Sequence, residues 1–222
     1  MKRFVRYSTL LTVLAACGIG TAHGQAAGAV GPDRGYVQFT VGPTFGHKSS
    51  SAIGGEAGYT LTDALQVFLE GGRMGNVATT DVDARAQIIG NTIGASVSTV
   101  QRAAYFDIGA KYRFPKEYGK WRPYALLGVG TASVKTTTNF SIGGNDVTSQ
   151  MGQYGVQLGN DLSGTLTKAF LTVGVGTNAT LGQRYLLDLS YRYGRVFPRT
   201  SQIADDKGIN TQRLQAGIGI RF

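Results

Sequence analysis

The feature that most constrains this chain is an alternation of apolar and polar side chains with a period of two, repeated in eight segments. Such a period places neighbouring side chains on opposite faces of a β-strand. In the last segment, Leu214 to Phe222, every second residue is apolar and the residues between are Gln215, Gly217, Gly219 and Arg221. Beyond the N-terminus, no segment offers the ~18 continuous apolar residues of a membrane-spanning helix. The sequence therefore predicts an all-β protein whose strands have one apolar and one polar face.

The predicted strands are connected alternately by short and long segments. The alternation lies near residues 37–42, 53–59, 65–70, 106–113, 125–130, 169–176, 185–193 and 213–222. Short connections fall at 61–64, 115–122 and 181–184, a modest one at 46–51, and long polar ones at 75–100, 136–164 and 196–210. Short turns at one end and long loops at the other are typical of outer-membrane barrels. Strands in hydrocarbon must pair every backbone group, so their sheet must close.

We therefore predict a transmembrane eight-stranded antiparallel up-and-down β-barrel over residues 34–222, with both termini at the short-turn, periplasmic end. Eight strands give an interior just wide enough for side chains to fill. A soluble lipocalin-like barrel is the rival fold, and its apolar face would point inward. The barrel is expected to be a monomer.

Residues 1–24 have the pattern of a signal peptide. Three cations, Lys2, Arg3 and Arg6, precede a short apolar run at 10–17, and Ala22 and Gly24 are small residues suited to a cleavage site before Gln25. A short N-terminal segment, 25–33, would follow. The tetrapeptide ending at Cys17 also resembles a lipobox, in which that cysteine would be lipidated. Cleavage near Gly24 would leave a mature chain without cysteine.

Charge argues against a nucleic-acid partner. The formal net charge is +9, and three of the positive charges lie in the leader. The remaining Lys and Arg residues are scattered singly, whereas a nucleic-acid surface gathers them into a patch or stripe. Contacts with anionic lipid headgroups and a charged lumen explain the excess more simply.

The polar face of the strands carries charges of both signs. The candidates for an interior charge network are Glu56, Glu70, Asp107, Lys111, Arg113, Asp188, Arg192, Arg213 and Arg221. Buried charges without partners cost several kcal/mol. We therefore expect a structural ion-pair network that blocks a wide channel; a selectivity lining for a small pore is the alternative.

Aromatic residues cluster beside the proposed short turns. They are Tyr59, Tyr112, Phe114, Trp121, Tyr124, Tyr185 and Phe222. Amphipathic rings are favoured where lipid meets water, so these residues are predicted to form a girdle at one membrane interface.

The C-terminal strand resembles the assembly signal of outer-membrane proteins in Gln215, Gly217, Ile220 and the terminal Phe222. The stretches 54–63 and 123–130 resemble the small OmpA/OmpX-type and opacity-type outer-membrane β-barrels, and the likeness covers roughly 34–222. The resemblance implies a place in the bacterial outer membrane, with outer-membrane lipid and the barrel-assembly machinery as partners. Members of this family serve as adhesins, stress-induced surface proteins, envelope structural proteins or narrow pores.

Candidate chemistry is sparse. An acyl-transferring or deacylating barrel would need a serine nucleophile with a histidine base, and His47 is the histidine that remains after the leader. Asp81 with Asp83, and Asn145 with Asp146, do not match a calcium-loop spacing. We therefore expect no catalytic, cofactor or metal site.

The long loops are the expected working parts, with a possible surface ligand at 75–100, 136–164 and 196–210. Alternation at 96–104 and 154–158 predicts strands that project beyond the membrane. The sequence thus favours a non-enzymatic envelope-structural or adhesin-like protein. A narrow channel for small solutes and a lipid-modifying enzyme are the alternatives.

Overall fold

The structure, a computed structural model, describes residues 34–115, 121–182, 184–199 and 206–222. The described residues belong to one unit of the chain, Gly31–Phe222. The predicted signal peptide (1–24), the alternative lipidation site at Cys17 and the segment 25–33 all lie outside the described residues.

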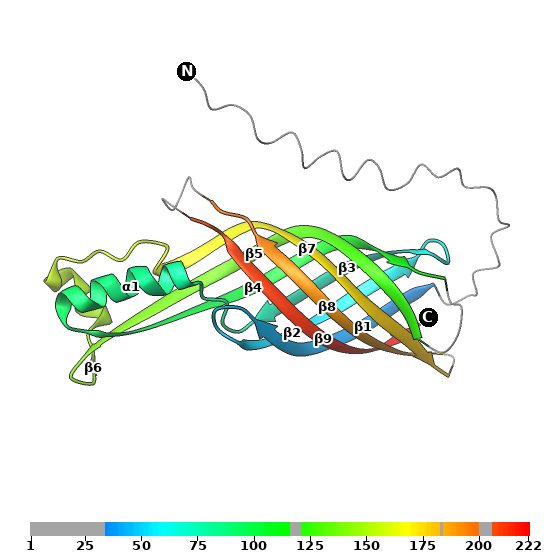
Figure 1. The fold of residues 1–222 in the computed structure, drawn as a ribbon, viewed down its shortest axis with the longest axis horizontal. Helices are drawn as coiled ribbons and strands as arrows, with labels where there is room; N and C mark the ends of the chain where they lie inside the picture. Colours follow the sequence, from blue (N-terminus) through cyan, green and yellow to red (C-terminus); the bar gives the residue numbers. More distant parts are fainter. Residues whose placement is uncertain (1–33, 116–120, 183, 200–205) are drawn as a thin grey trace, which may run out of the picture. The chain divides into compact units, whose positions relative to one another are not determined.

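Eight long antiparallel strands form a closed barrel (Figure 1). They are β1 (Gly35–Phe45), β2 (Ser50–Thr60), β3 (Leu65–Met74), β4 (Ser96–Arg113), β5 (Trp121–Ile142), β7 (Ser163–Leu181), β8 (Tyr185–Val196) and β9 (Ile209–Arg221). Each pairs with its neighbours in sequence, and the pairing of β1 with β9 closes the sheet. A two-residue strand, β6 (Asn145–Asp146), pairs with the end of β5. The predicted eight-stranded up-and-down barrel is confirmed.

The apolar face of the strands points outward. Exposed side chains on the wall include Phe39, Leu69, Phe106, Ile108, Val129, Val175, Leu189 and Ile218. The alternate residues point inward and are buried, among them Gln38, Thr40, Glu56, Thr172 and Ser190. This orientation is the opposite of a lipocalin-like barrel, whose ligand cavity is apolar.

Glycines in the lumen make room for aromatic rings. A Cβ added at Gly58 would overlap the ring of Tyr36, and one at Gly176 would lie 2.5 Å from the ring of Tyr124. No real side chain fits at such distances, so the glycine on one strand leaves the space that the ring from a neighbouring strand occupies. The glycine content of the polar face is therefore part of the packing of the barrel.

Three strands extend past the rest at the long-loop end. β4, β5 and β7 have 18, 22 and 19 residues, whereas the other five have 10 to 13. The predicted projecting strand at 96–104 is confirmed as part of β4. The one predicted at 154–158 is wrong: a 3₁₀-helix, η1 (Thr148–Tyr154), ends there, and residues 156–159 have no regular structure.

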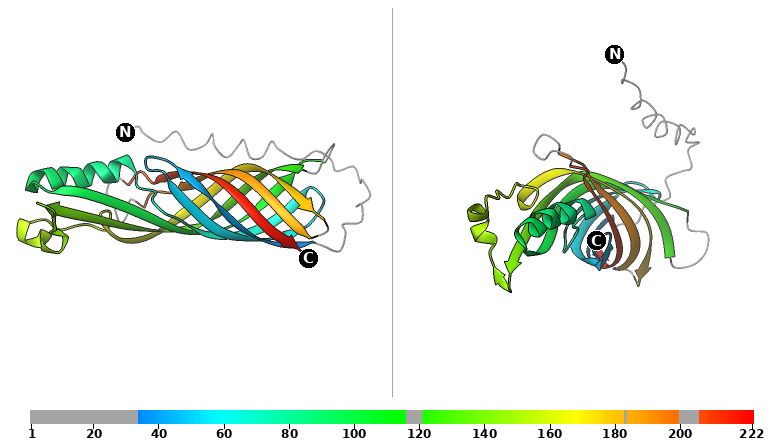
Figure 2. Two further views of the ribbon diagram at one scale, coloured as in Figure 1. Left: turned by 90° about the horizontal axis from the view of Figure 1, so that it is seen from below. Right: turned by 60° about the vertical axis from the view of Figure 1, so that its left-hand side comes forward.

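The predicted loop 75–100 contains a helix, α1 (Thr80–Ile93), which the strand periodicity did not reveal. Thr79 caps its first turn by accepting a hydrogen bond from the Val82 backbone N–H, and Gly94 ends it with a φ of 68°. Figure 2 shows α1 lying along the extension of β4. Within the described part of the chain, no helix is both long and apolar enough to cross a membrane.

Candidate functional site

The centre of the barrel holds an ion-pair cluster with Arg192 at its middle. The Arg192 guanidinium donates to Glu56 Oε2 at 2.9 Å and to Glu70 Oε2 at 2.5 Å. Lys111 pairs with Glu56, and Arg213 lies 3.4 Å from Glu70. All five side chains are almost completely buried. The members come from strands on different sides of the barrel, so the cluster ties opposite walls together.

Aromatic rings surround the two cations that have fewer carboxylate partners. Lys111 Nζ lies 4.8 Å from the centroid of the Tyr124 ring, and Arg213 Cζ lies 4.3 Å from that of Tyr105. Both contacts are within cation–π range. The Tyr105 hydroxyl donates to Glu70, and the Tyr36 hydroxyl donates to Glu56. Each carboxylate therefore accepts hydrogen bonds from cations and from a phenol.

The other predicted interior charges lie around this cluster without joining it. The Tyr124 hydroxyl lies within hydrogen-bond distance of both Asp188 carboxylate oxygens, at 2.7 and 2.9 Å, and Asp107 is fully buried without an ion pair among the described residues. Arg113 donates to the Thr62 carbonyl at 3.3 Å, and Arg221 donates to the Thr180 hydroxyl at 3.2 Å.

An apolar layer lies above the charges, toward the long-loop end. It consists of Ala52, Met74, Val77, Ala103, Tyr105, Ala132, Val134, Phe170, Val196 and Ile209. Every member is nearly buried, and the rings of Tyr105 and Phe170 are 5.6 Å apart. The lumen is thus filled by a charged layer and, above it, an apolar layer.

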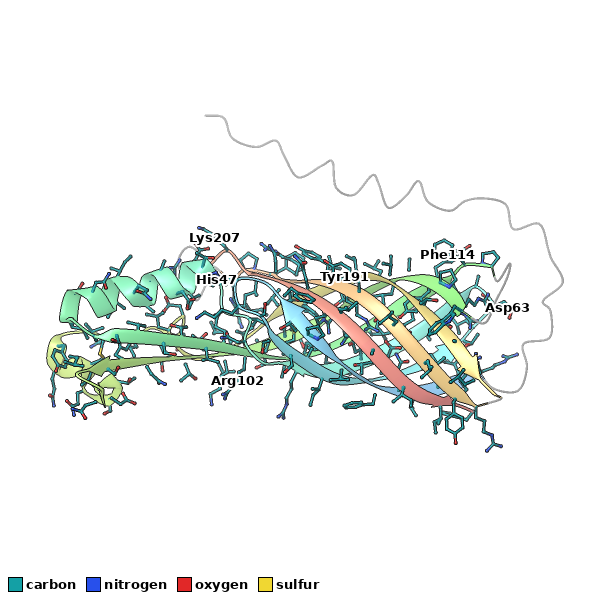
Figure 3. The ribbon with its side chains drawn as sticks, turned by 60° about the horizontal axis from the view of Figure 1, so that its bottom comes forward. His47, Asp63, Arg102, Phe114, Tyr191 and Lys207 are labelled. Atoms are coloured by element: carbon teal, nitrogen blue, oxygen red, sulfur yellow. The ribbon has the colours of Figure 1, made fainter. Side chains whose placement is uncertain are left out.

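The aromatic girdle has six of its seven predicted members. Tyr59, Tyr112, Phe114, Trp121, Tyr185 and Phe222 are exposed on the outer wall. Figure 3 labels Phe114 and Asp63, both at the short-turn end of the barrel. The prediction for Tyr124 is wrong, because this ring points into the lumen and is 1% exposed. Its hydroxyl needs a partner there, which Asp188 provides.

At the long-loop end, α1, η1, β6 and the projecting ends of β4 and β5 (residues 76–100 and 136–162) pack together; we call this unit the platform. Its core is Phe140, Val147 and Met151, against which Ile89, Ile93, Ala95, Val97, Ile142, Val156 and Leu158 pack. Residues read from sequence as a polar loop therefore form a folded unit with its own apolar centre.

Ion pairs connect the platform to the rim of the barrel. Lys207 reaches Asp81 at 2.9 Å, and Lys48 reaches Asp83 at 2.8 Å. A further pair, Arg85 with Asp161 at 3.4 Å, lies within the platform, and Lys168 with Asp206 at 2.6 Å lies within the rim. The sequence interpretation omitted Lys168, although its place between Thr167 and Ala169 on a strand put it on the inward face.

Two loop carboxyls have lowered pKa values. Burial alone would raise the pKa of Asp206, but hydrogen bonds from Lys168 and from the backbone N–H groups of Arg199 and Gly208 outweigh it and hold the pKa below the usual range. Hydrogen bonds from Thr148 lower the pKa of the exposed Asp146.

The histidine considered for catalysis is tied to the platform. His47 Nε2 lies 2.9 Å from Asp83 Oδ2, and Lys48 Nζ lies 2.8 Å from the same atom. Among the hydrogen bonds of the described residues, none joins His47 to a serine hydroxyl. Nor do the described residues contain three or more His, Cys, Asp or Glu side chains grouped to hold a metal ion.

The four residues of the predicted assembly signal lie on or next to β9. Gln215 and Gly217 face the lumen, while Ile220 and Phe222 are 48% and 63% exposed on the wall. Phe222 exchanges two backbone hydrogen bonds with Gly35, which begins β1. These residues thus lie where the barrel closes.

A closed barrel with an apolar wall, a polar filled lumen and elaborated loops at one end defines the class of small outer-membrane β-barrels. The chain belongs to the family described as outer membrane protein beta-barrel domain, whose model matches residues 9–222. It is a protein of the bacterial outer membrane. The long-loop end, and with it the platform, is therefore extracellular.

Solved structures with low sequence identity share the fold. Neisserial surface protein A is 17% identical with a TM-score of 0.54, and the match covers 85% of this chain and 97% of that one. A major outer membrane protein from Thermus thermophilus is 13% identical with a TM-score of 0.51, covering 85% of this chain and 99% of that one. No curated protein matches this chain by sequence.

Proposed function

We propose that this protein is a non-conducting, non-enzymatic barrel whose role is to hold the platform above the outer membrane for surface interaction. The observation that carries the proposal is the contrast between the two ends of the molecule. The lumen is filled by the Arg192 cluster and the apolar layer, whereas the platform is a folded unit built by strands that run on past the membrane.

The interior charges have a structural role in this proposal. A charge lining a pore must stay hydrated to attract passing ions, but Glu56, Glu70 and Arg192 pair with each other and have 0% side-chain exposure. Opening a path would separate these pairs in a medium of low dielectric constant, which is costly. Planar-bilayer recordings of the purified protein are expected to be silent, and stepwise conductance at physiological salt would favour a narrow solute channel instead.

The platform offers a surface suited to a polar partner. The outward side of its hairpin carries Ser96, Ser98, Thr137, Asn139 and Ser141, without charge. In the described register β3 ends opposite Ala103, so Ser96–Arg102 of β4 pair with β5 alone. The other edge of this stretch is covered by the chain itself: the Val77 N–H donates to the Gln101 carbonyl, Lys48 Nζ donates to the Thr99 carbonyl, and α1 packs along β4. The outward face of the hairpin is therefore the surface that it offers to a partner.

Adhesion can be tested by display on a bacterial strain that lacks its own adhesins. Binding to immobilised matrix proteins and glycans is compared between the wild type and a variant in which the platform, residues 76–100 and 136–162, is replaced by short turns. Heat-modifiable gel migration checks that both barrels are folded. Adherence that depends on the platform is expected; equal adherence by both would overturn the surface-interaction role.

The non-enzymatic part rests on the surroundings of His47. A histidine whose described partner is Asp83, with no serine hydroxyl bonded to it, lacks the nucleophile of an acyl-transferring site. Purified protein is expected to leave lipid A unchanged. Release or transfer of acyl chains that disappears in His47→Ala would contradict this part of the proposal.

We also propose that Gln215, Gly217, Ile220 and Phe222 are read by the barrel-assembly machinery. The exposed Phe222 side chain would be available to such a partner before the barrel closes. Phe222→Ser is expected to lower the folded amount in cells while the purified chain still folds in detergent. Equal losses in both settings would mean that the ring serves folding only.

A further inference from the structure

A group of three cations lies just above the apolar wall on one side of the barrel. On β4 the outward residues Ile108, Phe106 and Ala104 are followed, toward the long-loop end, by Arg102. On β3 the last outward residue is Arg73, and on β5 the outward residues Thr131 and Ser133 are followed by Lys135. All three side chains are exposed on the outside, and Figure 3 labels Arg102 on this wall.

The strand register brings the three cations together. Arg102 is directly opposite Lys135, and Arg73 is opposite Ala104, two residues further along β4. Adjacent strands lie about 4.8 Å apart and two residues span about 7 Å, so the three backbones occupy one small patch. Like charges directly opposite each other destabilise a sheet.

The chain itself does not neutralise the patch. Among the ion pairs and hydrogen bonds of the described residues, none involves the side chain of Arg73, Arg102 or Lys135. Other cations near this end are satisfied: Arg195 donates to Asn210, and Arg199 donates to the Thr167 carbonyl. The contrast indicates that an external anion belongs with the three cations.

The three cations line a groove of about 490 Å³ in the outer wall. The remaining lining is small or apolar: Ser51, Ile53, Met74, Gly75, Ala103, Ala104, Ser133 and Thr165. No carboxylate is among the described residues that line it. The small residues leave the hollow, Ile53 offers apolar contact at the membrane side, and the hydroxyls offer hydrogen bonds beside the cations.

We propose that this groove binds a phosphorylated glycolipid of lipid A type from the outer leaflet. Its phosphate would lie between Arg73, Arg102 and Lys135, and its acyl chains would run down the apolar wall below them. The cations lie on the long-loop side of the apolar outward residues of the same strands, which is the side where lipid headgroups are expected. Guanidinium groups suit phosphate because they donate two parallel hydrogen bonds. The inference depends on the outer-membrane location and not on the proposed adhesion.

Native mass spectrometry of the purified protein in neutral detergent provides the test. The protein is titrated with diphosphoryl lipid A, with chemically dephosphorylated lipid A, with phosphatidylglycerol and with inorganic phosphate. Diphosphoryl lipid A is expected to bind at least tenfold more tightly than each of the others. Equal binding of the dephosphorylated form would remove the role of phosphate. Equal binding of phosphatidylglycerol would overturn the glycolipid assignment, and equal binding of inorganic phosphate would overturn any lipid site.

Matched variants locate the site. Arg102→Gln with Lys135→Gln removes two charges from the groove, and Arg34→Gln with Arg184→Gln removes two exposed charges from the short-turn end. The groove variant is expected to bind diphosphoryl lipid A about 100-fold more weakly, about tenfold for each charge-assisted contact, with the control unchanged. Unheated gel migration verifies that both are folded. Similar weakening in both variants would show general attraction of the anion and would refute the site.

Discussion

Replacing Arg192 with Met tests whether the buried cluster stabilises the barrel. The change removes ion pairs of 2.9 Å to Glu56 and 2.5 Å to Glu70, at a position with 0% side-chain exposure. Removing one partner of a buried pair costs about 3–5 kcal/mol because a buried charge is left behind. Glu56 retains Lys111 and Glu70 retains Arg213, so we expect the low end, about 3 kcal/mol, in the free energy of unfolding.

The measurement is urea unfolding in detergent micelles, followed by the fluorescence of Trp121, the one tryptophan of the chain. Arg184→Met, an exposed position at the short-turn end, is the control and is expected to change stability by less than about 0.5 kcal/mol. The double variant Arg192→Met with Glu70→Gln should recover about 1–3 kcal/mol relative to the sum of its single changes, because the two groups are in contact. A loss below about 1 kcal/mol for Arg192→Met alone would refute the role of the cluster.

Three further outcomes are expected. Gly176→Val is expected to cost about 1–3 kcal/mol in urea unfolding, because its side chain would overlap the ring of Tyr124; stability equal to the wild type would contradict this packing. Gly90→Val should release α1 from β4, because a Cβ at this position would already overlap the side chain of Val97. Proteases should then cleave near residues 80–93 while the barrel stays intact. Resistance to proteolysis equal to that of the wild type would contradict the packing of α1 on β4. The pKa of Asp206 is lower in the folded protein than the ordinary aspartate value of about 4. The ionised carboxylate therefore stabilises its contacts above about pH 4, and this stabilisation is lost as the pH falls through the folded-state pKa. Acidification below about pH 4 should accordingly loosen the contacts that Asp206 makes. Asp206→Asn should abolish this pH dependence of proteolysis after Lys207.

The barrel was predictable from sequence because one physical rule acts at every strand. Each residue in the membrane faces either lipid or the lumen, so polarity reports orientation directly. The rule also contradicts the girdle assignment of Tyr124. This residue is one position from the outward-facing Ala125 and so belongs to the inward set with Leu126. The prediction relied on the aromatic character of Tyr124 near an interface, whereas its odd or even position along the strand (its parity) decides which face the side chain is on.

The platform was less predictable because it lies in water, where one period does not dominate. Signals for α1 were present: Thr79 before two acids in the first turn, and Gly94 after the last. The helix buries only Ala86 and Gly90 fully, so its apolar stripe is weak. At 154–158 the alternation of Tyr154, Val156 and Leu158 was misleading. Val156 and Leu158 pack onto the Phe140 core without forming a strand.

The predicted ion pairs needed more than parity. Parity put Arg192 and Glu70 on the inner face, but they are on strands far apart in the sequence, and only closure of the barrel brings them within 2.5 Å. The platform-to-rim pairs, such as Lys207 with Asp81, depend in the same way on a helix that the sequence pattern did not predict. Which side chains meet across the barrel axis depends on the stagger between neighbouring strands and on the barrel diameter. The alternation of polar and apolar residues in the sequence specifies neither.

Two layers of different chemistry fill the lumen, and this arrangement explains why substitutions in the charged layer should change stability without opening a pore. Water entering from the extracellular end has to pass the layer that contains Phe170, Val196 and Ile209, whose side chains offer it no hydrogen bonds. Water entering from the periplasmic end meets the paired charges, which are satisfied by one another. A variant that loses Arg192 still retains the apolar layer, so its bilayer recordings should stay silent. In the proposed non-conducting barrel the two layers would act as independent seals, so the loss of one would leave the other in place.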